Sequence, residues 1–259
     1  FAQNWFIKYN KFKLNGYKWS PESSLLMKQY IKQFLISILK YFNIQISINK
    51  NLKEIPIPLT TSKIEQICFF RDIIKKTKDL DGDIVECGVG HGRSLLLLTM
   101  LNNSFEKKNL YAFDSFEGFP DPKEYEKKSI NGIKKGYYKS SLESVKIFLA
   151  KSGIDDKDIK KINFVKGFLE DTLINYKNSI SLLHIDVDLA ESYKTVLNRL
   201  WDNIISGGII IFDEYKTKKW VTATQAINEF VKSKNLTINE YKTKYFTKHF
   251  VIKKWKLVD

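Results

Sequence analysis

Four acidic side chains follow two consecutive apolar segments in the second half of the chain. Asp186 and Asp188 come at the end of one segment, and Asp213 and Glu214 come at the end of the next. If the segments are neighbouring parallel strands, four carboxylates meet at one edge of a sheet and repel one another strongly. A hard divalent cation such as Mg²⁺ compensates this charge, because it prefers oxygen ligands. We therefore expect Asp186, Asp213 and Glu214 to hold a metal ion.

Such an ion could bind an acceptor hydroxyl, lower its pKa and orient it for reaction, with Asp186 as part of the catalytic group. Asp188 lies two residues after Asp186 and shares its face if the strand persists, which makes it a candidate general base. Two alternatives stay open at this point. Asp188 could cap a helix that begins near Ala190, or His184 could be the base, although a histidine in an apolar strand is more often a packed residue.

A glycine-rich turn at residues 83–92, DIVECGVGHG, is the second candidate site. Gly88 and Gly90 let the backbone turn sharply and approach a ligand closely, and a helix amino terminus then faces that ligand. Arg93 stands where the dinucleotide-binding fingerprint has its last glycine. Glu86 would repel a pyrophosphate but suits a cationic ligand with an α-amino group. The pattern favours S-adenosylmethionine, with a purely structural turn as the alternative.

The following strands supply further candidate contacts for an adenosine cofactor. The second predicted strand ends at Asp114, the position at which ribose hydroxyls are read in such folds. Its alternative role is that of a turn or cap residue. Phe168 and Asp171 follow the third strand and could flank the adenine.

Alternating strands and helices from residue 60 onward must position these side chains. The expected strands are 83–87, 109–113, 162–166, 180–186, 207–213, 236–242 and 248–254, and the expected helices are 62–78, 92–103, 141–151, 190–203 and 220–234. Ser62 and Glu65 form a candidate capping box for the first helix. This order predicts an α/β fold with a doubly wound, mostly parallel seven-stranded sheet and a closing antiparallel pair.

Residues 1–60 differ from the rest and are predicted to form an N-terminal helical accessory segment ahead of a catalytic domain at 61–259. Ser20 and Pro21 are typical of a helix start, and apolar residues then recur at i, i+3 and i+4. The apolar run is broken too often to span a bilayer. We expect this helix to pack on the catalytic domain or on a second subunit, with contact to a membrane surface as the alternative.

The charge and the cysteine content restrict the binding partners and the cellular location that we expect. The 259 residues carry a formal net charge of +14, yet the basic residues other than Arg71, Arg93 and Arg199 are lysines. Nucleic-acid binding relies strongly on arginine, so we do not expect a nucleic-acid partner, whereas an anionic small substrate such as a nucleotide-linked sugar would benefit from the charge. Cys68 and Cys87 do not suggest a disulfide framework, and we expect a cytoplasmic protein.

From about Thr60 to Lys254 the chain resembles the macrocin (TylF-type) O-methyltransferases, which methylate sugar hydroxyls on antibiotics and glycans. The matching stretches are VECGVGHGRS (85–94), YAFDSFEGFP (111–120), GYYKSSL (136–142), GFLEDTL (167–173) and the two acid motifs. The resemblance implies a class I methyltransferase fold, a magnesium ion on the three acids named above, a lid near Tyr137 and Tyr138, and homo-oligomers. The predicted cofactor contacts are Glu86, Gly88, Gly90, His91, Ser94, Asp114, Ser115, Phe168 and Asp171.

The predicted function is metal-dependent methylation of a sugar hydroxyl by S-adenosylmethionine, on a nucleotide-linked sugar, a glycan or a glycosylated natural product. The first acid motif departs from the family pattern Asp-Gly-Asp-x-Tyr-Glu-Ser, because this chain has Val187 and Ala190. The missing tyrosine alters the acceptor-side wall. A catechol-type O-methyltransferase and an RNA ribose methyltransferase are the alternatives. A non-catalytic subunit is disfavoured because all the acids are present.

Overall fold

The computed structural model describes residues 59–105 and 107–254, and residues 1–58 of the predicted accessory segment lie outside these ranges. One seven-stranded sheet has the order β3-β2-β1-β4-β5-β7-β6. Strand β7 runs antiparallel to both β5 and β6, and the remaining pairs are parallel. The predicted doubly wound sheet is confirmed. The strands are β1 (Asp83–Cys87), β2 (Leu110–Asp114), β3 (Ile162–Lys166), β4 (Ile180–Ile185), β5 (Ile204–Phe212), β6 (Asn239–Lys242) and β7 (Thr247–Ile252).

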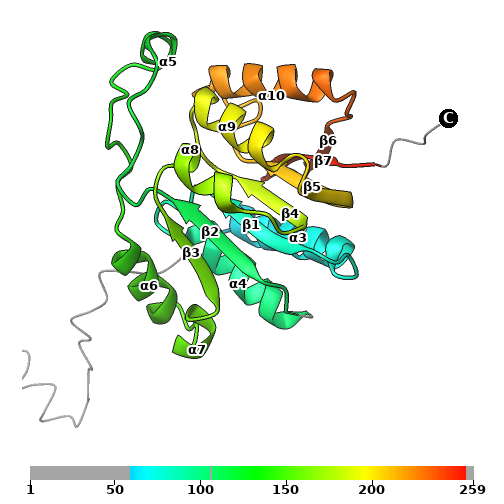
Figure 1. Cartoon of the computed structure of the whole chain (residues 1–259). Coiled ribbons are helices and arrows are strands. Elements are labelled where there is room, and N and C mark those ends of the chain that lie inside the picture. Colours follow the sequence, from blue (N-terminus) through cyan, green and yellow to red (C-terminus); the bar gives the residue numbers. More distant parts are fainter. Residues whose placement is uncertain (1–58, 106, 255–259) are drawn as a thin grey trace, which may run out of the picture. The chain divides into compact units, whose positions relative to one another are not determined.

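Helices cover both faces of this sheet (Figure 1). They are α3 (Thr61–Thr77), α4 (Arg93–Ser104), α5 (Glu124–Ser129), α6 (Leu142–Lys151), α7 (Asp156–Ile159), α8 (Leu169–Thr172), α9 (Ala190–Leu200) and α10 (Val221–Ser233), with a 3₁₀ turn at Leu173–Asn175. Alternate strand residues enter two separate apolar cores. Val85 and Cys87 pack towards α9 and α10, whereas Ile84 packs towards α3 and α4.

The strand order places the functional motifs at one edge. The chain moves outward from β1 to β2 and β3 and then returns to β4 on the other side of β1, so a switch point lies between β1 and β4. In the strand register Cys87 is level with Ile185, and Ile185 is level with Phe212. The glycine turn and the two acid motifs therefore leave the sheet at the same level.

Several details differ from the sequence-based expectations. Thr60, not Ser62, precedes the first helix, and its side chain accepts a hydrogen bond from the Lys63 backbone N–H at 3.2 Å. The predicted Ser62–Glu65 capping box is therefore wrong. Strand β5 begins at Ile204, ahead of the expected start, because its first residues pair with β4. None of the described helices is long and apolar enough to cross a membrane.

Candidate active site

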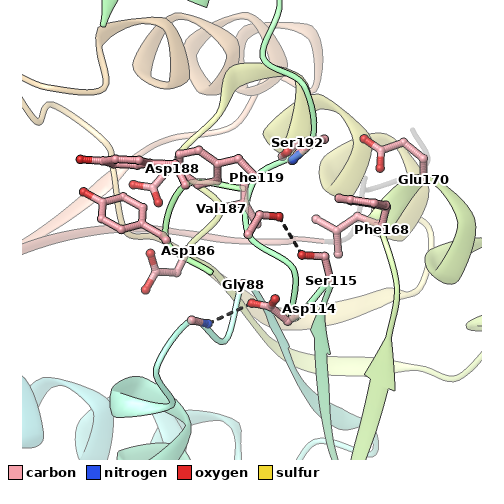
Figure 2. A pocket seen from close by; sticks show the side chains of 16 residues that line it. Gly88, Asp114, Ser115, Phe119, Phe168, Glu170, Asp186, Val187, Asp188 and Ser192 are labelled. Carbon is pink, nitrogen blue, oxygen red and sulfur yellow. Dashed lines mark hydrogen bonds between the residues drawn. The ribbon is translucent and has the colours of Figure 1, made fainter. Parts of the chain in front are cut away.

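A pocket opens at the carboxyl ends of β1, β2 and β4 (Figure 2). Both predicted sites contribute to it. The wall includes five of the expected cofactor contacts and two of the acids: Gly88, Gly90, Asp114, Ser115, Phe168, Asp186 and Asp188. The structure thus brings the glycine turn and the first acid motif into one cavity.

Gly88 is the point of closest approach between these two motifs. Its φ is +88°, and a Cβ atom there would lie 1.8 Å from the carbonyl oxygen of Asp186. The backbone N–H of Asp186 donates to the carbonyl oxygen of Cys87 at 2.9 Å. Only glycine fits this position, because any side chain would push the end of β4 away from the turn.

Asp114 fixes the shape of the glycine turn from the neighbouring strand. Its Oδ2 accepts hydrogen bonds from the backbone N–H groups of Val89 and Gly90 at 2.8 and 2.9 Å. Its Oδ1 accepts from the N–H of Phe116 at 2.6 Å. The carboxylate is held at the pocket wall by three backbone amides, so a ligand meets it in a fixed orientation. Its predicted contact with ribose stays a prediction.

Four predicted cofactor residues lie elsewhere. Glu86 is fully buried beneath the turn and does not line the pocket. His91 and Asp171 are exposed and Ser94 is half-buried, and none of the three lines the pocket. Their cofactor roles stay predictions, and the pocket wall beside Phe168 is formed by Leu169 and Glu170 instead of Asp171.

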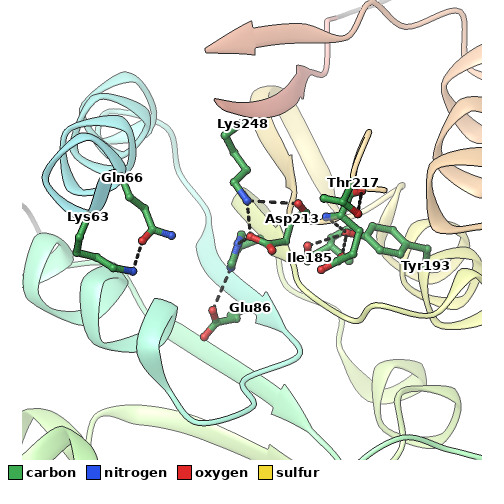
Figure 3. Close-up of polar contacts among 10 residues, drawn as sticks. Lys63, Gln66, Glu86, Ile185, Tyr193, Asp213, Thr217 and Lys248 are labelled. Atoms are coloured by element: carbon green, nitrogen blue, oxygen red, sulfur yellow. Dashed lines mark hydrogen bonds and ion pairs between the residues drawn. The ribbon is translucent and has the colours of Figure 1, made fainter. Parts of the chain in front are cut away.

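A chain of charged groups crosses four strands beneath the pocket (Figure 3). Glu86 on β1 contacts Nδ1 of His184 on β4 at 3.0 Å. The Nε2 atom of His184 lies 3.9 Å from Oδ1 of Asp213, which follows β5. Lys248 on β7 donates a short hydrogen bond to the same Asp213 oxygen. The sequence analysis missed Lys248, although a lysine two residues before the buried Phe250 in a strand is a signal for an inward-facing charge.

This charged chain sets the pKa values of the acids unequally. Burial would raise the pKa of Asp213, but the Lys248 ammonium and His184 hold it well below its usual value. Burial and the Asp213 carboxylate raise the pKa of Asp186 to about 8 and that of Asp188 to about 7. Burial favours the neutral ring of His184, yet the carboxylates of Asp213 and Glu86 outweigh it and raise its pKa to about 9. The acids of β4 therefore lack sufficient positive charge nearby.

The donor atoms fit a divalent cation. Atoms of His184, Asp186 and Asp213 lie within 4.8 Å of one another, and Nε2 of His184 is buried without a hydrogen-bond partner in the described ranges. The predicted ligand Glu214 is turned towards Tyr193, whose hydroxyl donates to its carboxylate. Two of the three predicted metal ligands are thus gathered, with His184 in place of Glu214. Carboxylates suit Mg²⁺ and Mn²⁺, whereas an imidazole suits transition metals, so the set does not require magnesium.

Asp188 faces the pocket and not the following helix. Its φ is +61°, a left-handed conformation that turns the chain after Val187. Helix α9 begins after Leu189, and the side chain that accepts from its first turn is that of Glu126, which takes the backbone N–H of Glu191 at 3.3 Å. The alternative that Asp188 serves as a helix cap is therefore wrong. Its carboxylate stays available to a ligand in the pocket.

The comparison with protein families decides the assignment. The model of the macrocin O-methyltransferase (TylF) family matches residues 63–247. The chain belongs to this family. The predicted resemblance is confirmed, and the glycine turn, Asp114 and both acid motifs of this TylF-family chain all lie within the matched residues.

Two curated relatives of this TylF-family chain come from Streptomyces. One is the 8-demethyl-8-(2,3-dimethoxy-alpha-L-rhamnosyl)-tetracenomycin-C 4'-O-methyltransferase of Streptomyces olivaceus, which is 27% identical over 145 residues, 52% of this chain and 53% of the relative. The other is the demethyldecarbamoylnovobiocin O-methyltransferase of Streptomyces niveus, 26% identical over 144 residues, 53% of this chain and 54% of the relative. The chain spans about half the length of these relatives.

The fold is also found among solved structures. A calicheamicin methyltransferase superposes with a TM-score of 0.66 at 21% sequence identity, covering 91% of this chain and 94% of the other. At this identity the likeness concerns the fold, which is that of a class I methyltransferase.

Proposed function

We propose that this TylF-family chain is an S-adenosylmethionine-dependent O-methyltransferase that acts on a sugar hydroxyl of a glycosylated natural product or of a nucleotide-linked sugar, and that it requires a divalent cation. The observation that carries the proposal is the contact between the two motifs at Gly88 and Asp186. It joins a turn suited to an adenosine cofactor to a cluster of acids within a single cavity. The curated relative that acts on a rhamnosyl tetracenomycin supports a sugar acceptor.

The residues divide into those that bind and those that move a proton. S-adenosylmethionine, when bound, supplies an electrophilic methyl group, and the glycine turn with Asp114 and Phe168 would hold it. A divalent cation on Asp186, Asp213 and His184 would lower the pKa of an acceptor hydroxyl. Asp188 lines the same pocket and would accept the proton of that hydroxyl as the general base.

The pocket itself contributes by positioning. Asp186 and Asp188 face the same cavity as the glycine turn, so an acceptor held there is confined next to the cofactor site. Holding two reactants in contact accounts for a large share of the rate in such transfers. Leaving Asp188 outside the helix end keeps its carboxylate free for this role.

Metal-dependent turnover tests the proposal. The full chain is incubated with labelled S-adenosylmethionine and a panel of free, nucleotide-linked and natural-product glycosides, with Mg²⁺, with Mn²⁺ or with a chelator. We expect a mass gain of one methyl group on a sugar acceptor, abolished by chelator. Asp213→Ala should abolish turnover while S-adenosylmethionine binding changes by no more than a few-fold, and Asp81→Ala, at an exposed acid, is the matched control.

Two results would contradict this function. Full activity in chelator would refute the role of the cation. Methylation confined to phenols or to RNA would refute the sugar acceptor while leaving the cofactor assignment in place.

A further inference from the structure

Three aromatic rings line the pocket that also holds Asp188, and one ammonium group and a tryptophan pack against these rings. We call Phe119, Tyr137, Tyr138, Lys219 and Trp220 the mouth cluster. The first three residues belong to the long segment between β2 and α6, and the last two to the connection between β5 and α10. Phe119 packs edge-on against Tyr138 at 5.4 Å and against Trp220 at 6.0 Å between ring centroids. Two segments far apart in sequence therefore form one surface.

The backbone holds the two tyrosines of this surface in place. The N–H of Phe119 donates to the carbonyl oxygen of Tyr137, and the N–H of Gly136 donates to that of Phe119, both at 3.0 Å. A Cβ atom on Gly118 would lie 2.6 Å from the carbonyl carbon of Gly136, so the two stretches of backbone approach this closely only because glycine is present. Tyr138 has a φ of +57°, a conformation that non-glycine residues adopt rarely. The backbone between β2 and α6 therefore fixes the positions of the two tyrosine rings.

Lys219 is oriented by the rings around it. Its Nζ atom lies 4.5 Å from the ring centroid of Trp220 and 4.9 Å from that of Tyr138. The ammonium also donates to the Tyr138 hydroxyl oxygen at 2.6 Å. These contacts hold the cation at one position at the pocket mouth, whereas a free lysine side chain would sample many.

The charge of Lys219 has no direct carboxylate partner. Within residues 59–105 and 107–254 it forms no ion pair, and two of its three ammonium protons stay available after the bond to Tyr138. Tyr137 and Tyr138 are 41% and 46% exposed, although both line the pocket. Exposed rings at a cavity offer stacking surfaces for a sugar or a base. A fixed ammonium next to them offers a site for an anion.

We infer that the mouth cluster is the recognition site for the acceptor and selects a sugar joined to a phosphate group, which Lys219 binds while Tyr137 and Tyr138 stack on the rest of the molecule. The inference rests on the proposed function and specifies its substrate class. Lysine is a common phosphate ligand because its ammonium acts as a point charge with several donors. The net charge of +14 favours a multiply charged group such as a diphosphate.

Binding of thymidine diphosphate, measured by calorimetry on the full chain, tests the anion site without any reaction. Lys219→Met should weaken this binding about ten-fold or more, the effect of losing a hydrogen bond to a charged group. Lys219→Arg should retain most of it. Lys218→Met removes the same charge from the next position, which is exposed, and should change the affinity less than about two-fold. Tyr138→Phe keeps the ring but loses the hydroxyl, so a loss of a few-fold is expected.

Turnover of two matched acceptors tests the selection. Rhamnose is used because it is the sugar named for a curated relative. We compare kcat/KM for thymidine-diphospho-rhamnose with that for neutral methyl rhamnoside. The ratio should favour the diphosphate sugar and fall about ten-fold in Lys219→Met, because any effect on Asp188 applies equally to both acceptors and cancels in the ratio.

The outcomes separate the inference from the proposed function. If Lys219→Met and Lys218→Met weaken thymidine diphosphate binding equally, or if the wild-type chain does not bind it, the mouth cluster is not a phosphate site. An unchanged acceptor ratio in Lys219→Met also overturns the inference, while methylation of either sugar leaves the proposed function standing. If neither sugar is methylated, the binding measurement still decides the role of Lys219.

Discussion

Asp186→Asn should stabilise the metal-free protein at alkaline pH. Burial and the Asp213 carboxylate raise the pKa of Asp186 to about 8, against an ordinary value of 3.8. Between these values the unfolded chain releases the proton while the folded chain keeps it. The proton that the folded chain keeps on Asp186 contributes to the free energy of unfolding. This contribution is fully present below pH 3.8 and is lost as the pH rises through about 8. Asparagine does not titrate, so the variant escapes the loss.

The size of the effect follows from the same shift. Four pKa units correspond to an upper limit of about 6 kcal/mol. Asp186 lines the pocket and is only half-buried, so screening by water reduces the expected effect to about 2 kcal/mol. For a domain of this size that corresponds to a difference in Tm of about 4–8 °C.

Thermal unfolding between pH 5 and pH 9 in chelator measures this difference. The Tm of Asp186→Asn minus that of the wild type should grow with pH, whereas the exposed acid variant Asp81→Asn should follow the wild type throughout. Adding Mg²⁺ or Mn²⁺ at pH 8 should raise the Tm of the wild type and leave Asp186→Asn unchanged, because binding to the folded state adds stability. A Tm difference that stays flat across this pH range would refute the assignment of Asp186 as an uncompensated acid.

Two further changes test the charged chain and the glycine turn. Lys248→Met removes the ammonium that neutralises Asp213, a carboxylate partly open to water. In urea the metal-free variant should lose about 2 kcal/mol of unfolding free energy, and Mg²⁺ should restore it. If the metal-free variant is as stable as the wild type, the ion pair is not stabilising. Gly88→Ala should lower the unfolding free energy by more than about 3 kcal/mol, because its Cβ would meet a backbone carbonyl oxygen. Gly132→Ala, at a similar φ with open space around it, should lose only about 1 kcal/mol, and similar losses in both variants would contradict the packing argument.

Local sequence patterns were enough to locate the centre of the fold. The apolar run ends at Cys87, and the next position accepts only glycine. Strand β1 accordingly has the predicted bounds, Asp83–Cys87. The meeting of Asp186 and Asp213 follows from the same logic, because parallel neighbours end at the same edge. Sequence spacing fixes which residues end a strand, and the doubly wound order then brings those ends together.

The rest of the site depends on tertiary pairing that spacing does not contain. Lys248 reaches Asp213 because the antiparallel register places His249 opposite Phe212, and many registers were compatible with the sequence. Glu214 is turned towards Tyr193 because helix α9, which precedes β5, brings that hydroxyl into reach. Lys219 is positioned by contacts with a segment about eighty residues earlier in the sequence, such as its hydrogen bond to Tyr138. The sequence pattern of neither segment predicts that contact.

Strand β7 couples the completion of the fold to the readiness of the acids. It inserts between β5 and β6 and delivers the ammonium of Lys248 to Asp213. During synthesis, every strand that carries a candidate catalytic carboxylate emerges before β7 does. A nascent chain that has not yet added this strand holds Asp213 without the Lys248 ammonium, and the edge of β5 stays open. Strand β7 is the last of the described strands in sequence, so Asp213 gains the Lys248 ammonium only once this strand has joined the sheet.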